Sequence, residues 1–414
     1  MPRGRAWLDP GARVGGRPGA DQQLAAAHSP CGALLSASPL RAEAVIDLDA
    51  IAANTAALRA HVERRQLMAV VKADGYGHGI VESGRAARAG GADWLGVALL
   101  DEALQLRAAG DTGPVLSWLA VPGERYDAAI AAGVEVSAYS VEQLEEVAAA
   151  ARTAGARASV QLKLDSGLGR GGASADSWPT LVAAARAAQD RGDLEVTGVW
   201  SHLACSDEPT HPSVGAQVAE FETGLSYARS AGLEPRHVHL ANSGAALAIP
   251  RAWFTMVRPG ISLYGISPFA DGSSPVPLRA ALRLQARLAL VKRVRAGQGI
   301  SYGHRYTTAT ATATTLALVP LGYGDGIPRH AGNRGPVWID GRVFPVAGAV
   351  SMDQVVLDIG DLPARAGDMA VLIGDPALGQ PTARDWAAAA DTIGYEIVTR
   401  VSARVPRRYV GGSR

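Results

Sequence analysis

Short apolar runs that alternate with helical stretches are the feature that most constrains the fold of this chain. After residue 40 there are eight such runs, rich in aliphatic and β-branched residues, and about one helix of Ala- and Arg-rich sequence separates each from the next. This spacing predicts an α/β fold in which parallel strands close into a (β/α)8 barrel of the TIM type. A doubly wound open sheet is the alternative, but it usually has fewer strands and one point where the strand order reverses. The runs end near Lys72, Leu99, Ala120, Ser140, Asp165, His202, Asn242 and Arg258.

A second pattern begins beyond about residue 275, where apolar and polar residues alternate with a period of two. This period is typical of strands with one buried face, so we expect a mainly antiparallel β domain over residues 276–414. Asp340-Gly341 lies between two such stretches and is a strong signal for a type I′ hairpin turn. One late helix is expected in "TARDWAAAADTIG", with Thr382 as its N-cap.

The chain is therefore expected to have three parts. Residues 1–40 are rich in Gly, Pro, Ala and Arg without periodicity, and we expect a disordered extension there, or a start codon assigned too early. Residues 41–275 make up the predicted barrel, and residues 276–414 the β domain. The apolar run at 44–48 precedes the barrel strands, so we expect it to pair with the β domain.

Composition excludes several classes of function. Hydrophobic residues make up 48% of the chain and charged residues 19%, and the net charge is +1, so no strong field attracts nucleic acid or an anionic membrane. No apolar run reaches the ~18–20 residues of a membrane span. The two cysteines, Cys31 and Cys205, form no CxxC pair, so neither a disulfide scaffold nor a cysteine metal site is expected. A reducing cytoplasm fits this cysteine usage.

Polar residues gather at the predicted strand ends, which is where barrels of this type carry their active sites. Lys72 ends the first strand, His202 the sixth and Arg258 the eighth. Such barrels often bind a phosphate after strands seven and eight, where Ser243 offers a hydroxyl and Gly260 lets backbone N–H groups approach closely. No GxxxxGK[ST] loop for a nucleotide triphosphate is present. A phosphate site opposite an amine suggests pyridoxal phosphate, which needs both.

Each of these residues also has a simpler explanation. A lysine at a strand end is usually a solvated cap, and a histidine on an apolar strand is usually a paired core residue. The glycines of "GYG" usually serve turns, and Asp165 could pair with Arg170 across a loop. The placement of such residues at the ends of five different strands nevertheless favours one shared site.

Several segments resemble one family. "AVVKADGYGHG" is similar to the cofactor-lysine motif of the alanine racemases, fold-type III pyridoxal-phosphate enzymes that combine a barrel with a β domain. The lysine motif alone would be shared with looser barrel relatives, but several of the other segments are specific to these racemases. The resemblance runs in order from about residue 41 to 410. Its other segments are "LKLDSGLGRGG", "WSHLACSDEP", "HLANSGA", "MVRPGISLYG", "ISYGHRY", "PLGYGDGIPR", "SMDQ" and "IGYEIVTRVSARVPR".

The resemblance implies a role for each matching residue around the cofactor. Lys72 holds pyridoxal 5′-phosphate and is one catalytic base, and Tyr302, from the partner subunit of a homodimer, is the second base. Arg258 faces the pyridine nitrogen, and His202 links it to Tyr302. The residues expected to hold the cofactor phosphate are Tyr76, Ser243, Gly260, Ile261 and Tyr395.

The resemblance also implies how the substrate is held. Arg170 and the backbone at Met352 approach the substrate carboxylate. Lys163 matches a lysine that is often carbamylated in the family and then pairs with Arg170. Tyr323 and Asp353 shape the entrance.

The resemblance therefore implies interconversion of L-alanine and D-alanine, which supplies D-alanine for peptidoglycan. Three departures bear on substrate range: Ser166 stands where threonine is usual, Ser351 where cysteine is common, and Gly324 where alanine is common. A racemase of broader range, for example one acting on serine, is the nearest alternative. A barrel-type amino-acid decarboxylase and a non-catalytic cofactor carrier fit the β domain and the Tyr302 motif less well.

Overall fold

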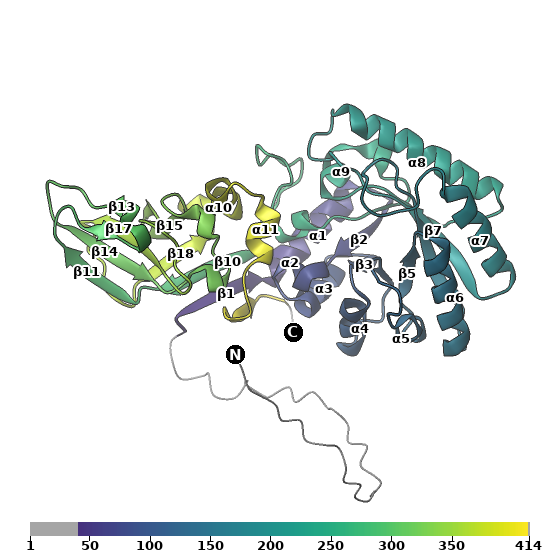
Figure 1. Cartoon of the computed structure of the whole chain (residues 1–414), viewed down its shortest axis with the longest axis horizontal. Coiled ribbons are helices and arrows are strands. Elements are labelled where there is room, and N and C mark those ends of the chain that lie inside the picture. The colour runs from purple at the N-terminus through teal and green to yellow at the C-terminus, as the bar shows by residue number, and fades with distance from the viewer. Residues whose placement is uncertain (1–39, 413–414) are drawn as a thin grey trace, which may run out of the picture. The chain divides into compact units, whose positions relative to one another are not determined.

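Eight parallel strands form the barrel that the alternating runs predict. The computed structural model describes residues 40–412, and in it the strands are β2 (Gln66–Val70), β3 (Trp94–Val97), β4 (Val115–Ser117), β5 (Glu135–Ala138), β6 (Ala158–Lys163), β7 (Leu194–Trp200), β8 (His237–His239) and β9 (Met256–Val257). Their order in the sheet is β8-β7-β6-β5-β4-β3-β2-β9 (Figure 1). The N–H of Thr255 donates to the carbonyl of Val238 at 3.0 Å, and that of Arg258 to the carbonyl of Ala241 at 2.9 Å. These bonds join the two ends of the sheet, so the (β/α)8 fold is confirmed.

The strands read as continuous apolar runs because both of their faces are covered. Every residue of β3 and of β4 is buried. One face of each strand packs in the barrel interior and the other against helices, which is typical of parallel sheets. β3 and β4 end at Val97 and Ser117, a few residues before the ends that the sequence predicts near Leu99 and Ala120.

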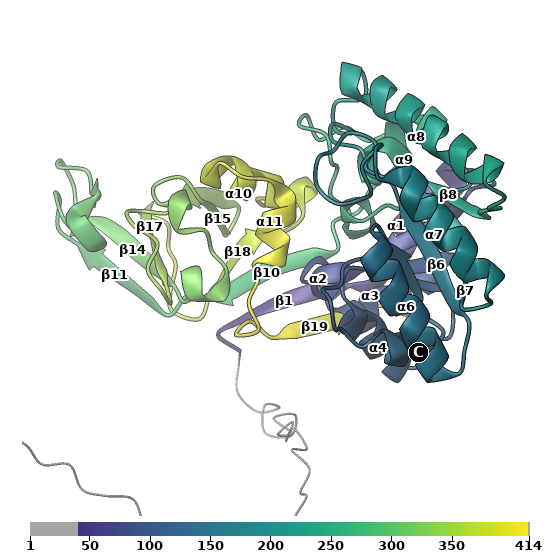
Figure 2. The same cartoon turned by 45° about the vertical axis from the view of Figure 1, so that its right-hand side comes forward.

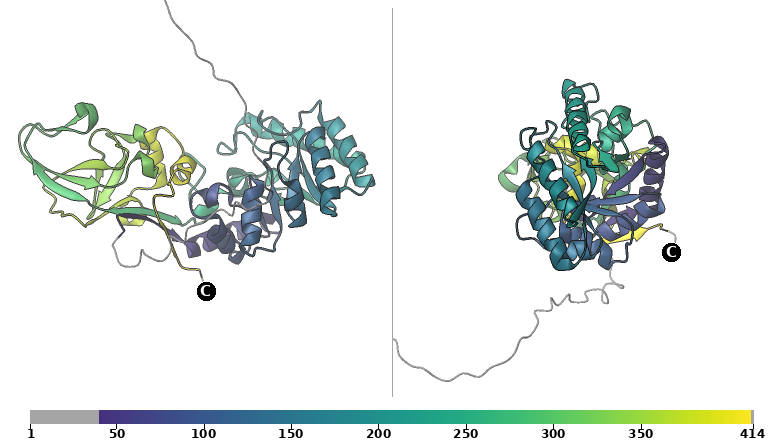
Figure 3. Two further views of the ribbon diagram at one scale, coloured as in Figure 1. Left: turned by 60° about the horizontal axis from the view of Figure 1, so that its bottom comes forward. Right: turned by 90° about the vertical axis from the view of Figure 1, so that its right-hand side faces the viewer.

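Helices surround the outside of the sheet (Figure 3). They are α1 (Leu48–His61), α2 (Lys72–Tyr76), α3 (Ile80–Ala89), α4 (Leu100–Ala108), α5 (Tyr126–Ala131), α6 (Val141–Ala154), α7 (Trp178–Asp190), α8 (Pro212–Ser230) and α9 (Ser243–Ala248), with the 3-10 turns η1 (Pro250–Ala252) and η2 (Ile261–Tyr264). Local sequence sets their ends. Before α6, the hydroxyl of Ser140 accepts the N–H of Gln143 at 3.2 Å, and after it Gly155 adopts a φ of 62°.

The β domain contains a six-stranded sheet in the order β16-β15-β18-β10-β1-β19, a three-stranded sheet β11-β14-β17 and a two-stranded ribbon β12-β13. Its strands are β1 (Ala42–Asp47), β10 (Leu282–Arg287), β11 (Leu290–Val294), β12 (Gly299–Ile300), β13 (Tyr306–Thr307), β14 (Thr314–Val319), β15 (Pro336–Ile339), β16 (Arg342–Pro345), β17 (Val355–Gly360), β18 (Met369–Ile373) and β19 (Arg407–Val410). The 3-10 turns are η3 (Tyr302–His304), η4 (Tyr323–Asp325), η5 (Arg329–Ala331) and η6 (Pro376–Leu378). The pairing is antiparallel throughout except between β1 and β19, which are parallel.

Strand β1 precedes the barrel in sequence but belongs to the sheet of the β domain. It pairs with β10, with Ala44 opposite Leu284, and with β19, with Ala44 opposite Arg407. Figure 2 shows β1 between these two strands. The helix that follows β1, α1, packs against α3 of the barrel, so the first elements of the chain contact both parts.

The turn and cap signals of the β domain are present, but one helix was not predicted. Asp340 and Gly341 connect β15 to β16 with φ values of 43° and 81°, as a type I′ turn requires. Thr382 caps α10 (Ala383–Ala390) as expected. The prediction of a single late helix was wrong, because α11 (Gly394–Thr399) follows. Its six residues are too few to show helical periodicity, and no side chain caps its first turn.

Some expectations concern residues that the structure does not describe. The extension expected over residues 1–40 lies outside the described residues except for Leu40, and so does Cys31. Cys205 is a free, partly buried thiol. Within residues 40–412 there is no helix of the length and apolarity that a membrane crossing demands, and no cluster of side chains suited to a metal ion.

Candidate active site

The loop that begins at Lys72 turns back on itself directly after β2. Four consecutive residues, Ala73, Asp74, Gly75 and Tyr76, have φ values of 53°, 53°, 61° and 53°. This left-handed backbone is unfavourable for residues other than glycine, so contacts within the loop must hold it. The carboxylate of Asp74 accepts the N–H of Ile80 at 3.0 Å, which closes the loop onto α3.

Lys72 is a poor match for a solvated cap. Its Nζ lies 5.7 Å from the centroid of the Trp118 ring. Burial lowers its pKa, and the charges of Arg170 and Arg258 act in the same direction, against the carboxylate of Glu102. A larger fraction of this amine is therefore unprotonated near neutral pH than of an exposed lysine.

Tyr76, Ser243 and Gly260 meet beside this loop although they are far apart in sequence. The N–H of Gly260 donates to Ser243 Oγ at 2.8 Å. A Cβ atom at Gly260 would overlap Tyr76 Oη, so only glycine fits between these two hydroxyls. The ring of Tyr76 lies 6.2 Å from that of Tyr395, and Ile261 follows Gly260 at the start of η2. The structure thus brings together the five residues predicted for the phosphate.

Arg258 is buried and donates to several acceptors. Its Nη1 lies 2.9 Å from His239 Nδ1, and its Nη2 lies 2.8 Å from the carbonyl of Ser201 and 3.3 Å from His202 Nδ1. Burial lowers the pKa of Arg258 to about 9, which leaves it charged at neutral pH. Burial, followed by the charge of Arg258, holds the pKa values of His202 and His239 well below 6.5, so both imidazoles are neutral.

The ring of Trp200 lies beside two cations of the site. Lys163 Nζ lies 4.5 Å from its ring centroid, and the Arg258 guanidinium lies 4.9 Å from it. Burial, followed by the charges of Arg170 and Arg258, lowers the pKa of Lys163 to about 8. Asp165 does not pair with Arg170 in the described residues; its carboxylate instead accepts the N–H groups of the glycine-rich loop that follows it.

The predicted site residues of the β domain other than Tyr395 are exposed. Tyr302 is 73% exposed and Met352 is 53% exposed, and Tyr323 is also exposed. Within residues 40–412 no hydrogen bond or ring contact joins Tyr302 to Lys72 or His202. Strand β13, which follows Tyr302 in the chain, lies together with β11 and β14 at the end of the β domain that is remote from α2 (Figure 1). Asp353 forms an ion pair with Arg404 at 2.8 Å.

Sequence reasoning missed several residues at this site. Trp118, Trp200 and His239 contact Lys72, Lys163 and Arg258. One signal pointed to the partner of His239: a buried polar residue in a strand needs a hydrogen-bond partner, and "SVQLKLD" places Gln161 two residues before Lys163 on the same face.

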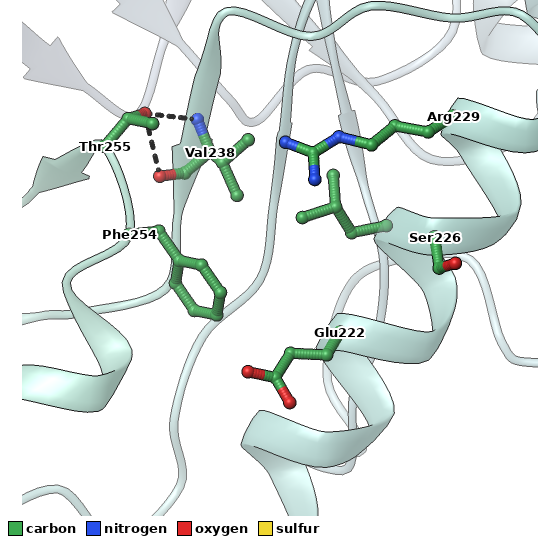
Figure 4. A pocket seen from close by; sticks show the side chains of 7 residues that line it. Glu222, Ser226, Arg229, Val238, Phe254 and Thr255 are labelled. Atoms are coloured by element: carbon green, nitrogen blue, oxygen red, sulfur yellow. Dashed lines mark hydrogen bonds between the residues drawn. The ribbon is translucent and has the colours of Figure 1, made fainter.

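A pocket lies elsewhere on the barrel (Figure 4). It has a volume of about 310 Å³ and is lined by residues of α8, of β8 and of the segment before β9: Glu222, Leu225, Ser226, Arg229, Val238, Phe254 and Thr255. The N–H of Val238 donates to Thr255 Oγ1 at 2.8 Å. Because Thr255 precedes β9, this pocket is at the amino end of the strand, and it contains none of the predicted site residues.

His78, in the same loop as Tyr76, is a fully buried imidazole with one satisfied nitrogen. Its Nδ1 lies 2.9 Å from the carbonyl of Tyr76 and 3.0 Å from that of Gly75, so it must carry the proton. Its Nε2 has no hydrogen-bond partner among the described residues. Burial, together with the charge of Arg407, lowers the pKa of His78 to about 4 although the two carbonyls raise it.

This pKa predicts acid sensitivity. Above pH ~6.5 His78 is neutral in both states, whereas between pH ~6.5 and ~4 the unfolded chain binds a proton that the folded chain does not. Stability therefore falls as the pH falls, and His78 alone should remove about 2 kcal/mol between about pH 7.5 and about pH 5. His78→Asn keeps a donor to the two carbonyls but has no group that titrates. Over the same pH range its free energy of unfolding, measured with urea, should fall by about 2 kcal/mol less than that of the wild type. His304→Asn, at an exposed histidine, is the control, and equal losses in His78→Asn and wild type would contradict the prediction.

The fold and this geometry define a class: an enzyme built on a (β/α)8 barrel, with a lysine-centred site at the carboxyl ends of the strands. The sequence comparisons narrow the class. Residues 46–268 match the alanine racemase N-terminal domain, and residues 281–409 match the alanine racemase C-terminal domain. The chain belongs to the alanine racemase family, whose members are amino-acid racemases.

Individual relatives agree over nearly the whole chain. The chain is 55% identical to the alanine racemase of Frankia casuarinae over 386 residues, which cover 93% of this chain and 99% of that protein. A crystal structure of alanine racemase from D-cycloserine producing Streptomyces lavendulae has a TM-score of 0.89 and 52% identity, covering 91% of this chain and 98% of that one. The alanine racemase of Bartonella henselae, solved with covalently bound pyridoxal phosphate, has a TM-score of 0.80 and 30% identity, covering 90% of this chain and 100% of that one.

Proposed function

We propose that the chain interconverts L-alanine and D-alanine with pyridoxal 5′-phosphate as its cofactor, and that the reaction supplies D-alanine for cell-wall peptidoglycan in the cytoplasm. The observation that carries the proposal is the convergence, at one end of the barrel, of an amine with a lowered pKa and a cradle of hydroxyls and glycine. The Bartonella relative with covalently bound pyridoxal phosphate supports the choice of cofactor.

The cradle fits a phosphate group. Ser243 Oγ and the N–H of Gly260 are already 2.8 Å apart, and Tyr76 Oη fills the space where a Cβ atom at Gly260 would lie. Hydroxyl and backbone N–H donors that meet at one point are what phosphate oxygens require. Ile261 and Tyr395 complete the set, and Ser243 at the first turn of α9 adds its own backbone N–H.

The amine of Lys72 fits the aldehyde of the cofactor. An amine attacks an aldehyde only in its unprotonated form, and burial with two neighbouring guanidinium groups favours that form. When bound, the cofactor spreads the charge left by the departing α-proton into its ring.

Racemisation requires proton transfer on both faces of the α-carbon, and one side chain cannot easily reach both. We assign Lys72 to one face and Tyr302 of a second chain to the other. His202 would link Tyr302 to Arg258: its Nδ1 accepts from Arg258, so its Nε2 carries a proton that can be donated toward a phenol oxygen. The exposure of Tyr302, 73%, is compatible with this use in a second chain.

Arg258 would face the pyridine nitrogen. An arginine keeps its proton, so it can donate a hydrogen bond but does not readily hand over a proton as an acid would. We infer that this limits the withdrawal of electrons by the ring, which favours return of the proton to the α-carbon over transamination.

The substrate carboxylate would lie near Arg170 and the backbone of Met352. The charge of Arg170 lowers the pKa values of both Lys72 and Lys163, so Arg170 is close enough to act on an anion beside them. Carbamylation of Lys163 would replace a cation by an anion next to Arg170, and its pKa of about 8 makes the unprotonated amine accessible for that reaction. Tyr323 and Asp353 would shape the entrance.

The proposed reaction is tested with purified protein, L-alanine and added pyridoxal 5′-phosphate. D-Alanine should accumulate until the two enantiomers are equal, and removal of the cofactor should stop the reaction. L-Serine in a parallel reaction tests the breadth of the substrate range. Protein that stays colourless with added cofactor and produces no D-amino acid would exclude the proposal.

Gly260→Ala tests the phosphate cradle separately from catalysis. The added methyl group would overlap Tyr76 Oη, so one wall of the cradle must move. We expect the Kd for pyridoxal 5′-phosphate to rise at least about tenfold, as loss of one charge-assisted hydrogen bond predicts. The Kd is measured by titrating the apo-protein and following the cofactor absorbance. Gly215→Ala on α8, whose Cβ would lie 3.5 Å from Arg251, is the control, and equal Kd values in the two variants would exclude the cradle.

A further inference from the structure

A line of hydrogen bonds crosses the barrel interior from Arg258 to the opposite end. Arg258 Nη1 lies 2.9 Å from His239 Nδ1, and His239 Nε2 lies 2.6 Å from Gln161 Oε1. Gln161 Nε2 donates to Glu135 Oε2 at 2.8 Å. Arg258 and His239 are at the carboxyl ends of β9 and β8, Gln161 is inside β6, and Glu135 is the first residue of β5. The line therefore connects the site to the amino end of the barrel.

The groups at the two ends of this line determine which partner donates in each hydrogen bond. A guanidinium has only donors, and at the other end Glu135 Oε2 accepts from both Gln161 and Thr197. His239 Nδ1 must therefore accept from Arg258, which leaves the proton on Nε2 to be donated to Gln161 Oε1. The amide nitrogen of Gln161 then faces Glu135. Each orientation depends on the next one along the line.

The surrounding strands are shaped around these residues. Gln161 and His239 are completely buried, where a polar group without a partner costs free energy. The pairing of β6 with β7 shifts register between Val160 and Gln161, a bulge that passes over Thr197. The hydroxyl of Thr197 donates to Glu135 Oε2 at 2.6 Å.

The next residue of β7 leaves room for the amide. A Cβ atom at Gly198 would lie 3.0 Å from both Cδ and Oε1 of Gln161, and 2.7 Å from the carbonyl of His237. Any larger residue at this position would displace the Gln161 amide. The bulge and this glycine are thus two independent features of β7 that accommodate the line.

We propose that Glu135 is a positioning residue for Arg258. As an acceptor at the amino end of the barrel, it orients the Gln161 amide, which keeps the proton of His239 on Nε2 and the lone pair of Nδ1 toward Arg258. Without that acceptor the amide can rotate, and the tautomer of His239 with a proton on Nδ1 would present an N–H to the N–H of Arg258. The effect on turnover rests on the proposed function; the effect on His239 does not.

Glu135→Leu removes the acceptor, and Glu135→Gln keeps one. In the wild-type holoenzyme, ¹⁵N spectra of histidine, assigned by the signal lost in His239→Gln, should show Nε2 protonated and Nδ1 unprotonated. Glu135→Leu should add the other tautomer and lower kcat about tenfold with KM within about twofold, as loss of a group that orients a site residue typically does. Glu135→Gln should restore the wild-type spectrum. Glu195→Leu is the matched control, because Glu195 is a carboxylate at the same end that pairs with Arg236 at 2.7 Å outside the line.

An unchanged His239 spectrum in folded Glu135→Leu would overturn the proposal, as would an equal change in Glu195→Leu. If Glu135→Leu does not fold, Gln161→Met keeps the side-chain volume, removes both bonds of the amide and should give the same loss of the Nε2 tautomer. A wild-type protein that does not racemise alanine would exclude the proposed function and still leave the His239 spectrum as a direct test of this inference.

Discussion

Lys72→Ala is expected to lower kcat/KM for alanine by at least about 10³-fold. The variant loses both the amine that holds the cofactor and the base on one face of the α-carbon. The chain contains only three lysines, Lys72, Lys163 and Lys292. Lys163 is the one that could compete for the cofactor, because its pKa is also lowered, to about 8.

Because there are only three lysines, one labelling experiment can show which of them holds the cofactor. Reduction of the holoenzyme with borohydride fixes the cofactor to the lysine that holds it, and peptide mapping should find it on Lys72. Lys292→Ala, at an exposed position on β11, is the matched control and should keep full activity and the cofactor absorbance. Label on Lys163, or an unchanged absorbance band in Lys72→Ala, would contradict the assignment.

The barrel could be predicted because burial on both faces makes each strand a continuous apolar run. The same reasoning placed Lys72, His202 and Arg258 at strand ends, and the structure brings His202 and Arg258 within 3.3 Å of each other. The predicted ends of β3 and β4 lie a few residues beyond the observed ones. The sequence does not distinguish an apolar residue that follows a strand from one inside it. α11 was missed because six residues do not reveal a helical period.

The line from Arg258 to Glu135 could not be predicted, because it depends on register. Gln161 and Glu135 are 26 positions apart, and whether their side chains meet is decided by how β5, β6 and β7 pair. The bulge at Thr197 leaves no mark in the alternation of apolar residues. Sequence patterns identify the strands and their ends, whereas contacts across the barrel come only from coordinates.

The structure of one chain cannot test the role of Tyr302, because the resemblance places this tyrosine in the site of a partner chain. A mixing experiment decides this point. Tyr302→Phe alone should lower kcat about 10²- to 10⁴-fold, as loss of a general base does. In a mixed dimer of Tyr302→Phe and Lys72→Ala chains, one site would contain Lys72 of the first and Tyr302 of the second, and the other site would lack both.

Refolding the two inactive variants together at equal concentrations should therefore restore activity. Half of the dimers would be mixed and each would have one complete site, so about one quarter of the wild-type activity is expected if chains associate at random in a twofold dimer. Each variant refolded alone is the control for the procedure. If Tyr302 acted on the Lys72 of its own chain, no pairing of the two variants could reunite them, and the mixture would stay as inactive as its components.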